Sequence, residues 1–473
     1  MPSRSSRAAA LVAVAWGAWA AAPARGADAV PPTPPADPLL ARLVDEAIAS
    51  RPELRQAEAA ARAERERIPQ AGALPDPMLS LGIQNDGFGE LQIGKMETSW
   101  WQVMITQGLP WPGKRGLRAD VARQSAAVAD AGVSRARLTT EADVRRSYVD
   151  LLLARDRLAL LARLESLWQK SAGIARTRYE TGEGAQSDVL RAQLELNRLK
   201  QRRWALEAQE RAALQSLNRL RGRPLDESIA TAAGVRDLGA PALRDADAAA
   251  VDALARSPEL AQARAGAARA GRQEALARRE RFPDLAVSAG VMPRGGLEPM
   301  WTASIAIGLP VWSSRKQGRA VAESAARAEA DGSAAEAFER TVRLRVAERR
   351  SALAALLDSI RLYRDGLLVQ SSATADSTLA QYRVGKVTFA SVLEANAGYV
   401  NDEDGFLAAL ADAQRLAIAD AEVSLDPVAQ PGAGGAMGGG AMPGAGAAGG
   451  GAMGAAPASA GGAPAAAAAS PGM

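Results

Sequence analysis

Four short segments of this chain alternate apolar and polar residues, and a period of two is typical of β-strands. In the first segment Leu79, Leu81 and Ile83 share one face, whereas Ser80 and Gln84 lie on the other. The four segments are residues 78–84, 98–109, 285–291 and 301–308. They fall into two pairs separated by short loops, so the pattern predicts two β-hairpins.

Long helical patterns follow each hairpin. Residues 114–180 contain no proline and would form a helix of about 100 Å. A second such pattern covers residues 315–383. Apolar residues recur every seven positions, as at Val144, Leu151 and Leu158, which indicates left-handed coiled-coil packing. Further helices are expected over residues 39–69 (ended by a proline cluster), 187–221 and 389–423.

The junction between hairpin and long helix has a characteristic sequence that occurs twice. The first copy is Gln107-Gly-Leu-Pro-Trp-Pro-Gly-Lys-Arg-Gly116 and the second is Ile307-Gly-Leu-Pro-Val-Trp-Ser-Ser-Arg-Lys316. Proline cannot donate to a sheet ladder but suits a turn or a helix start. We therefore expect each strand to end there and a helix to begin. The junction candidates are Pro110, Trp111, Pro112, Gly113, Pro310 and Trp312.

The duplication sets the domain organisation. We expect a signal peptide (1–27), a proline-rich leader (28–38), a first strand and helix repeat (39–224), a linker (225–244), a second repeat (245–425) and a Gly/Ala/Met-rich tail (426–473). Arg4 and Arg7 precede an apolar stretch and the small-residue cleavage site at residues 24–26, although an uncleaved anchor is the alternative.

The predicted strands suit a membrane better than a soluble core. They are about as long as tilted membrane strands, and tryptophans mark both of their ends, as at Trp101 and Trp111. The alternative is a pair of soluble hairpins packed on helices. Membrane barrels need about eight strands or more, so a chain with four must oligomerise to close one.

Composition excludes several functional classes. The chain has no cysteine and no histidine, so it forms no disulfide and lacks both residues as nucleophiles or metal ligands. The net charge is only +4, and arginines alternate with acidic residues along helix faces, which argues against nucleic-acid binding. No phosphate-binding loop is present. We expect no catalytic, cofactor or metal site in the folded part, and hence no enzyme.

The methionines of the tail are the one feature that suggests metal chemistry. Met437, Met442 and Met453 are thioethers spaced along a segment too poor in apolar residues to fold. Thioethers suit Cu(I) or Ag(I). The alternative is a disordered tail whose methionines merely reflect its composition.

A second duplicated motif identifies a family. Tyr179-Glu-Thr-Gly182, followed by Asp188-Val-Leu-Arg-Ala192, matches Tyr382-Arg-Val-Gly385, followed by Ser391-Val-Leu-Glu-Ala395. With the signal peptide, the doubled hairpins and the long helices, this order resembles the TolC-type outer-membrane efflux proteins over residues 39–425. The Pro-Trp-Pro-Gly-Lys-Arg junction resembles the branch that serves heavy-metal efflux pumps.

This resemblance implies a mainly α fold with a β-barrel portion. Three chains would contribute four transmembrane strands each to a twelve-stranded barrel in the outer membrane, and the long coiled-coil helices would form a periplasmic α-barrel. The implied partners are two further copies of the chain, outer-membrane lipid, a periplasmic adaptor and a proton-driven inner-membrane pump. The channel itself would be passive.

The resemblance also places the duplicated turns at the periplasmic tip, where the channel is gated. The tip candidates are Tyr179, Gly182, Asp188, Tyr382, Gly385, Ser391 and Glu394. Acidic residues constrict the tip in many relatives, but Ser391 stands where an aspartate is familiar. Asp188 and Glu183 would then compensate, unless Asp188 is only a charge that favours a helix start.

The expected function is therefore an exit duct that conducts heavy-metal ions out of the cell. Export of drugs, type I secretion of polypeptides, and a periplasmic coiled-coil spacer without a pore are the alternatives.

Overall fold

The computed structural model describes residues 37–428. The predicted signal peptide, nearly all of the proline-rich leader, and the tail with Met437, Met442 and Met453 lie outside the described residues. The elements in chain order are α1 (Pro38–Ser50), α2 (Pro52–Gly72), β1 (Met78–Gln84), β2 (Trp100–Leu109), α3 (Lys114–Glu180), α4 (Gln186–Leu220), α5 (Ala246–Arg256), α6 (Pro258–Arg279), β3 (Leu285–Arg294), β4 (Leu297–Ile307), α7 (Gln317–Leu362), a π-helical turn (Tyr363–Leu367), α8 (Leu368–Arg383) and α9 (Phe389–Glu422).

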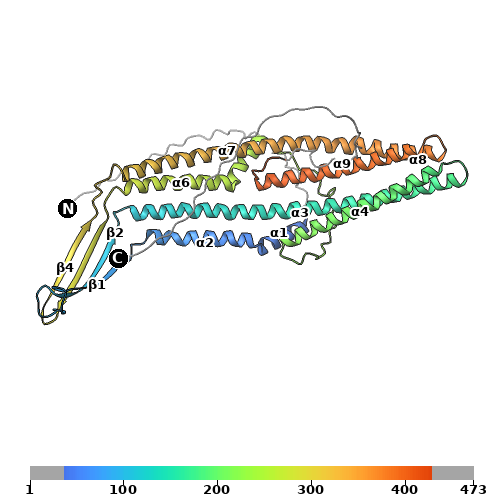
Figure 1. Ribbon diagram of the computed structural model, residues 1–473. Helices are drawn as coiled ribbons and strands as arrows, with labels where there is room; N and C mark the ends of the chain where they lie inside the picture. Colours follow the sequence, from blue (N-terminus) through green and yellow to red (C-terminus); the bar gives the residue numbers. More distant parts are fainter. Residues whose placement is uncertain (1–36, 429–473) are drawn as a thin grey trace, which may run out of the picture. The chain divides into compact units, whose positions relative to one another are not determined.

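The longest element is α3, whose 67 residues begin just after the second strand. It packs against α2 and α6 near the sheet and against α4 and α9 farther along (Figure 1). Its first residue follows Gly113, which has a φ of 93°. Its last turn leads into α4 through Gly182. One uninterrupted helix therefore connects the sheet to the turn that joins α3 and α4.

The first predicted helix is wrong in its continuity and in its end. Arg51 is extended, with a ψ of 119°, and separates α1 from α2. Pro52 is the cause, because the ring of a proline disfavours the helical conformation of the residue before it. The same break precedes Pro258, between α5 and α6. Pro69 does not end the helix, since α2 continues to Gly72.

The second long helix is also interrupted. The π-helical turn Tyr363–Leu367 divides the predicted helix 315–383 into α7 and α8. A π turn inserts one extra residue and rotates the following face of the helix. Here it coincides with packing of the Tyr363 ring on Phe406 of α9, with 6.4 Å between centroids. Gly405 leaves room for this contact, because a Cβ there would lie 2.5 Å from the Tyr363 hydroxyl.

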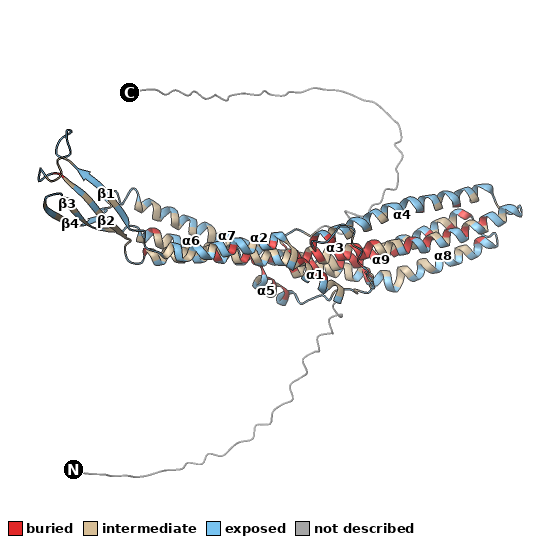
Figure 2. Cartoon of the chain, turned by 90° about the horizontal axis from the view of Figure 1, so that it is seen from below, coloured by how far each residue is buried: buried red, intermediate tan, exposed pale blue. Residues whose placement is uncertain are grey.

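The largest cluster of buried apolar side chains lies in the middle of the helical part. Figure 2 shows the buried residues concentrated where α1, α3 and α9 meet. Of the heptad positions named above, Val144 and Leu151 are buried in this cluster, and Leu158 is half-buried. The predicted linker also contributes, because Ile229 and Val235 are buried in the same cluster.

The two predicted hairpins are confirmed, and they join into one antiparallel sheet with the order β1-β2-β3-β4. The register aligns apolar residues with apolar residues. Leu81 is opposite Val103, which is opposite Val291, which is opposite Trp301. Residues that face one another across a ladder lie on the same side of a sheet. All the apolar side chains of this row therefore project from one face.

That apolar face is exposed, and the polar face is the more covered one. Leu81 is 72% exposed, Trp301 80% and Ile305 70%. On the other face Thr106 and Ser288 are half-buried, and their hydroxyls lie 2.9 Å apart in a hydrogen bond. The arrangement is the reverse of a soluble sheet, in which the apolar face is covered. It matches a membrane barrel, whose strands place apolar residues outside and polar residues inside.

The outer edges of β1 and β4 have no strand partner within residues 37–428. Unpaired strand edges readily pair with another chain. None of the helices described here has both the length and the apolar character of a bilayer-spanning helix.

Candidate functional site

The far end of α3 carries two turns that the sequence predicted to be related. Gly182 lies between α3 and α4 with a φ of 79°, and Gly385 lies between α8 and α9 with a φ of 71°. This region of backbone conformation favours glycine, because a Cβ is strained there. Both glycines therefore have the turn role that the sequence indicated.

Arg178 connects the two turns through hydrogen bonds. Its Nη1 donates to the carbonyl oxygen of Tyr382, and its Nη2 donates to that of Glu183 over 3.2 Å. The guanidinium also lies over the Tyr382 ring, 5.1 Å from the centroid. It passes so close to Gly385 that a Cβ there would be 3.0 Å from Nη2. One cation of the first repeat thus holds the turn of the second.

Tyr382 is the most enclosed of the predicted tip residues. It is 2% exposed, and its ring packs on Phe389 with 5.3 Å between centroids. Its hydroxyl donates to Oδ2 of Asp188 over 3.3 Å. Burial, together with the charge and the hydrogen bond of Asp188, raises the pKa of Tyr382 to about 12. The phenol is therefore a neutral hydrogen-bond donor at physiological pH.

The other predicted tip residues have different surroundings. Tyr179 is 46% exposed, so the two repeated tyrosines are not equivalent. Ser391 lies in the first turn of α9, where its backbone N–H donates to the Thr388 hydroxyl, the N-cap of that helix. Glu394 is exposed and forms no hydrogen bond or ion pair with any described residue. Asp188, in the first turn of α4, is the tip carboxylate that the structure brings to Tyr382.

The junction at the other end of α3 is built around Asp284, which directly precedes β3. Oδ1 of Asp284 accepts a hydrogen bond from the backbone N–H of Trp111 over 2.8 Å and another from Nζ of Lys114 over 2.7 Å. Lys114 is only 4% exposed and also donates to the carbonyl oxygen of Phe282. The Trp111 ring stacks on that of Phe282, with 5.5 Å between centroids.

Two further residues of the first junction, Pro112 and Gly113, lie against Arg279 of α6. The carbonyl oxygen of Pro112 accepts from Nε of Arg279 over 2.9 Å, and Gly113 leaves space for this guanidinium. Pro110 links the end of β2 to Trp111. The second junction is looser, since Pro310 begins a turn and Trp312 is 69% exposed. The two repeats share a sequence pattern here but not a set of contacts.

The sequence analysis missed two residues that make long-range contacts at these sites, Arg178 and Asp284. Arg178 has no special neighbours in the chain, so nothing signals its long-range contacts. Asp284 does have a signal, because a Pro-Asp pair precedes the first strand of each hairpin, as Pro75-Asp76 and Pro283-Asp284. Only the second aspartate meets a lysine: Asp76 forms no hydrogen bond or ion pair with any described residue.

Burial raises the pKa of Asp284, but the hydrogen bonds from Lys114 and Trp111 outweigh burial and lower the pKa overall. A carboxyl group whose pKa is lowered by folding stabilises the fold above its unfolded pKa of about 3.9, and this contribution is lost as the pH falls through the folded value. The Lys114 pair therefore stabilises the junction at neutral pH and not in strong acid.

Replacing Asp284 with alanine should lower the free energy of unfolding by about 1–3 kcal/mol at neutral pH, because it leaves the buried Lys114 ammonium without its carboxylate. Thermal unfolding followed by circular dichroism measures this change. Asp76→Ala is the matched control and should have little effect. Lys114→Met in the Asp284→Ala background should restore part of the loss. Equal midpoints for the Asp284 and Asp76 variants would contradict the role of the pair.

Comparison with known proteins identifies the family. A family model described as outer membrane efflux protein matches residues 43–223 and 249–423, which are the two repeats. The comparison with curated proteins found no match.

Among the residues described, no group of three or more acidic side chains could hold a metal ion.

Solved structures agree on the fold. The chain is similar to the open state of the MtrE outer membrane channel of Neisseria gonorrhoeae, with a TM-score of 0.70 and 19% identity over 82% of this chain and 89% of that one. It is similar to CusC, with a TM-score of 0.71 and 17% identity over 82% and 92%. It is also similar to VceC of Vibrio cholerae, with a TM-score of 0.67 and 17% identity over 80% and 94%.

These comparisons confirm the expected fold class, a helical periplasmic barrel continued by a β-barrel. Proteins of this kind are homotrimers that work with an adaptor and an inner-membrane pump, and they are passive channels rather than enzymes. The chain belongs to the outer membrane efflux protein family and is a channel of the outer membrane with a long periplasmic extension.

Proposed function

We propose that this channel is the exit duct for heavy-metal ions and that a proton-driven pump supplies it. The observation that carries the metal assignment is the junction sequence of residues 110–115, which resembles that of the heavy-metal branch. The thioethers of Met437, Met442 and Met453 lend support, because they suit soft cations such as Cu(I) and Ag(I). Export of drugs or secretion of polypeptides are the alternatives.

The contacts at the tip support a gate that is closed by the two turns. Arg178 joins the turn after α3 to the turn after α8, and the Tyr382 hydroxyl joins α8 to Asp188 of α4. Opening requires the α3–α4 pair to separate from the α8–α9 pair, so the Arg178 contacts must break. In this proposal Asp188 and Glu394 supply the carboxylates of the gate, whereas Ser391 is neutral.

Growth inhibition of a strain that lacks this channel tests the substrate class. We expect selective sensitivity to some of the ions of copper, silver, zinc, cobalt and cadmium, with restoration by the intact gene. A gene that ends at residue 428 tests whether the tail methionines contribute. Sensitivity confined to hydrophobic drugs would refute the metal assignment.

Replacing Arg178 with glutamine should weaken the closed tip. Hydrogen bonds to charged groups contribute about 1.5–3 kcal/mol, so loss of these contacts should raise the ratio of open to closed channels by about tenfold or more. Single-channel recording in planar lipid bilayers measures this ratio. Arg176→Gln is the matched control, because Arg176 lies on the same helix and, among residues 37–428, pairs only with Glu180. Identical open probabilities in both variants and wild type would exclude Arg178 from the gate.

A further inference from the structure

The helical part contains a partly open cavity that neither the tip nor the junction uses. Its volume is about 430 Å³, within the range of small-molecule sites. It lies between the segment before α5, α5 itself, α7 and α9. Part of its wall is apolar, formed by side chains such as Val346, Leu353 and Leu416.

Arg349 of α7 adds a positive charge beside this apolar wall. It lines the same cavity and is only 4% exposed. Its Nη2 is fully buried and has no hydrogen-bond partner among the described residues. Burial lowers the pKa of Arg349, and the charges of Asp420 and Glu422 oppose this effect. Because an arginine stays protonated in proteins, the cavity holds a buried and unpaired guanidinium.

The nearby carboxylates do not satisfy Arg349, because other arginines occupy them. Asp252 accepts from Arg244 and Arg256. The carboxylate of Asp420 lies 3.7 Å from Arg244. Four arginines but only two aspartates line the cavity, so it has an excess of positive charge.

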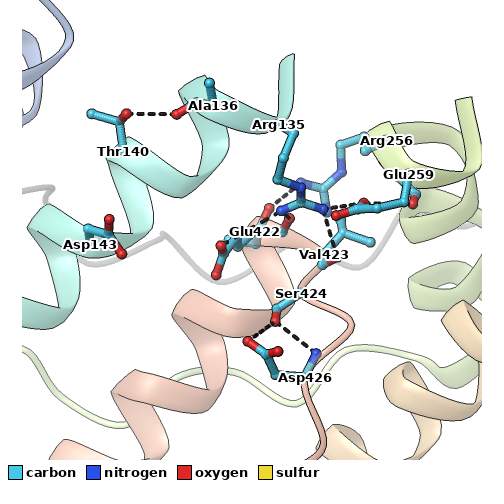
Figure 3. A network of polar contacts seen from close by, with 12 residues as sticks. Arg135, Ala136, Thr140, Asp143, Arg256, Glu259, Glu422, Val423, Ser424 and Asp426 are labelled. Carbon is cyan, nitrogen blue, oxygen red and sulfur yellow. Dashed lines mark hydrogen bonds and ion pairs between the residues drawn. The ribbon is translucent and has the colours of Figure 1, made fainter. Parts of the chain in front are cut away.

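Two further carboxylates, those of Asp426 and Glu422, lie near Arg349. Asp426 accepts a hydrogen bond from the Ser424 hydroxyl over 3.1 Å. Glu422 binds arginines of α3 instead. Its side chain forms ion pairs with Arg135 and Arg146 of α3. Figure 3 shows it beside Arg135, which is also bound to Glu259 of α6. A buried charge without a partner is costly, so the arrangement calls for an anion from outside the chain.

We propose that this cavity binds a small organic anion with one carboxylate and an apolar body. The planar fork of Arg349 matches a carboxylate in two parallel hydrogen bonds. Val346, Leu353 and Leu416 cover the apolar body. The apolar side chains disfavour an anion such as phosphate, which is polar on every side, because they offer it no hydrogen-bond donor.

The test uses ¹⁹F NMR of 4-fluorobenzoate with the purified full-length protein in a non-ionic detergent. Wild type should give a saturable change of the fluorine signal, and the uncharged 4-fluorobenzamide should not. Arg349→Gln should weaken the binding of 4-fluorobenzoate by about tenfold or more, because the charged hydrogen bonds are lost. Arg340→Gln is the matched control on the same helix, since Arg340 is 82% exposed and remote from the cavity.

A second variant separates binding from folding. Ala417→Phe keeps Arg349 but fills part of the cavity, and it should also abolish saturable binding. If Arg349→Gln does not fold, this variant decides. Absence of saturable binding to wild type would overturn the proposal, as would equal binding by the Arg349, Ala417 and wild-type proteins. Displacement of 4-fluorobenzoate by equimolar inorganic phosphate would overturn the carboxylate assignment.

Discussion

The register of the four-stranded sheet is the constraint on which the rest of the structure depends. Pairing Leu81, Val103, Val291 and Trp301 in one row collects apolar side chains on a face that the protein leaves exposed. A shift of one residue would turn every side chain to the other face. This face requires lipid, and the two open edges require further strands. Membrane insertion and oligomerisation thus follow from the same ladder.

The helices connect the sheet to the far end of the molecule. Asp284 binds both Trp111 and Lys114, so the sheet and the start of α3 are fixed to each other. The uninterrupted α3 then carries Arg178 to the opposite end, where it holds Tyr382. Both anchoring contacts cross from the first repeat to the second. The duplicated halves are therefore not equivalent in their contacts.

The sequence predicted much of the fold because local rules govern it. The limits of α3 were correct, since Gly113 and Gly182 mark its two ends. The hairpins were correct because period-two alternation is unambiguous in segments of this length. The missed helix breaks have local causes as well, and the Pro52 break could have been predicted from the proline effect on Arg51. The π turn could not, because it accompanies the packing of Tyr363 on a helix some forty residues away.

The site was only partly predictable. Repetition located both turns and Tyr382, but it also suggested that Tyr179 would be equivalent, and the burial of the two side chains differs widely. Arg178 and Asp284 bind partners that are distant in the sequence. The guanidinium of Arg349 instead has an Nη2 with no partner among the described residues. A single sequence does not encode those distances in any local pattern.

The assembly of a closed barrel requires β1 of one copy to pair with β4 of the next, and disulfide cross-linking tests this pairing directly. The chain has no cysteine, so introduced pairs give a clean result. Ser80 and Thr302 lie in one row at opposite edges, about 14 Å apart within a chain, which is too far for an internal disulfide. Ser80→Cys should be combined with cysteine at Met300, Thr302 or Ser304. Oxidation of at least one pair should give covalent trimers, and none should give longer products. Only monomers from all three pairs would contradict this pairing of β1 with β4.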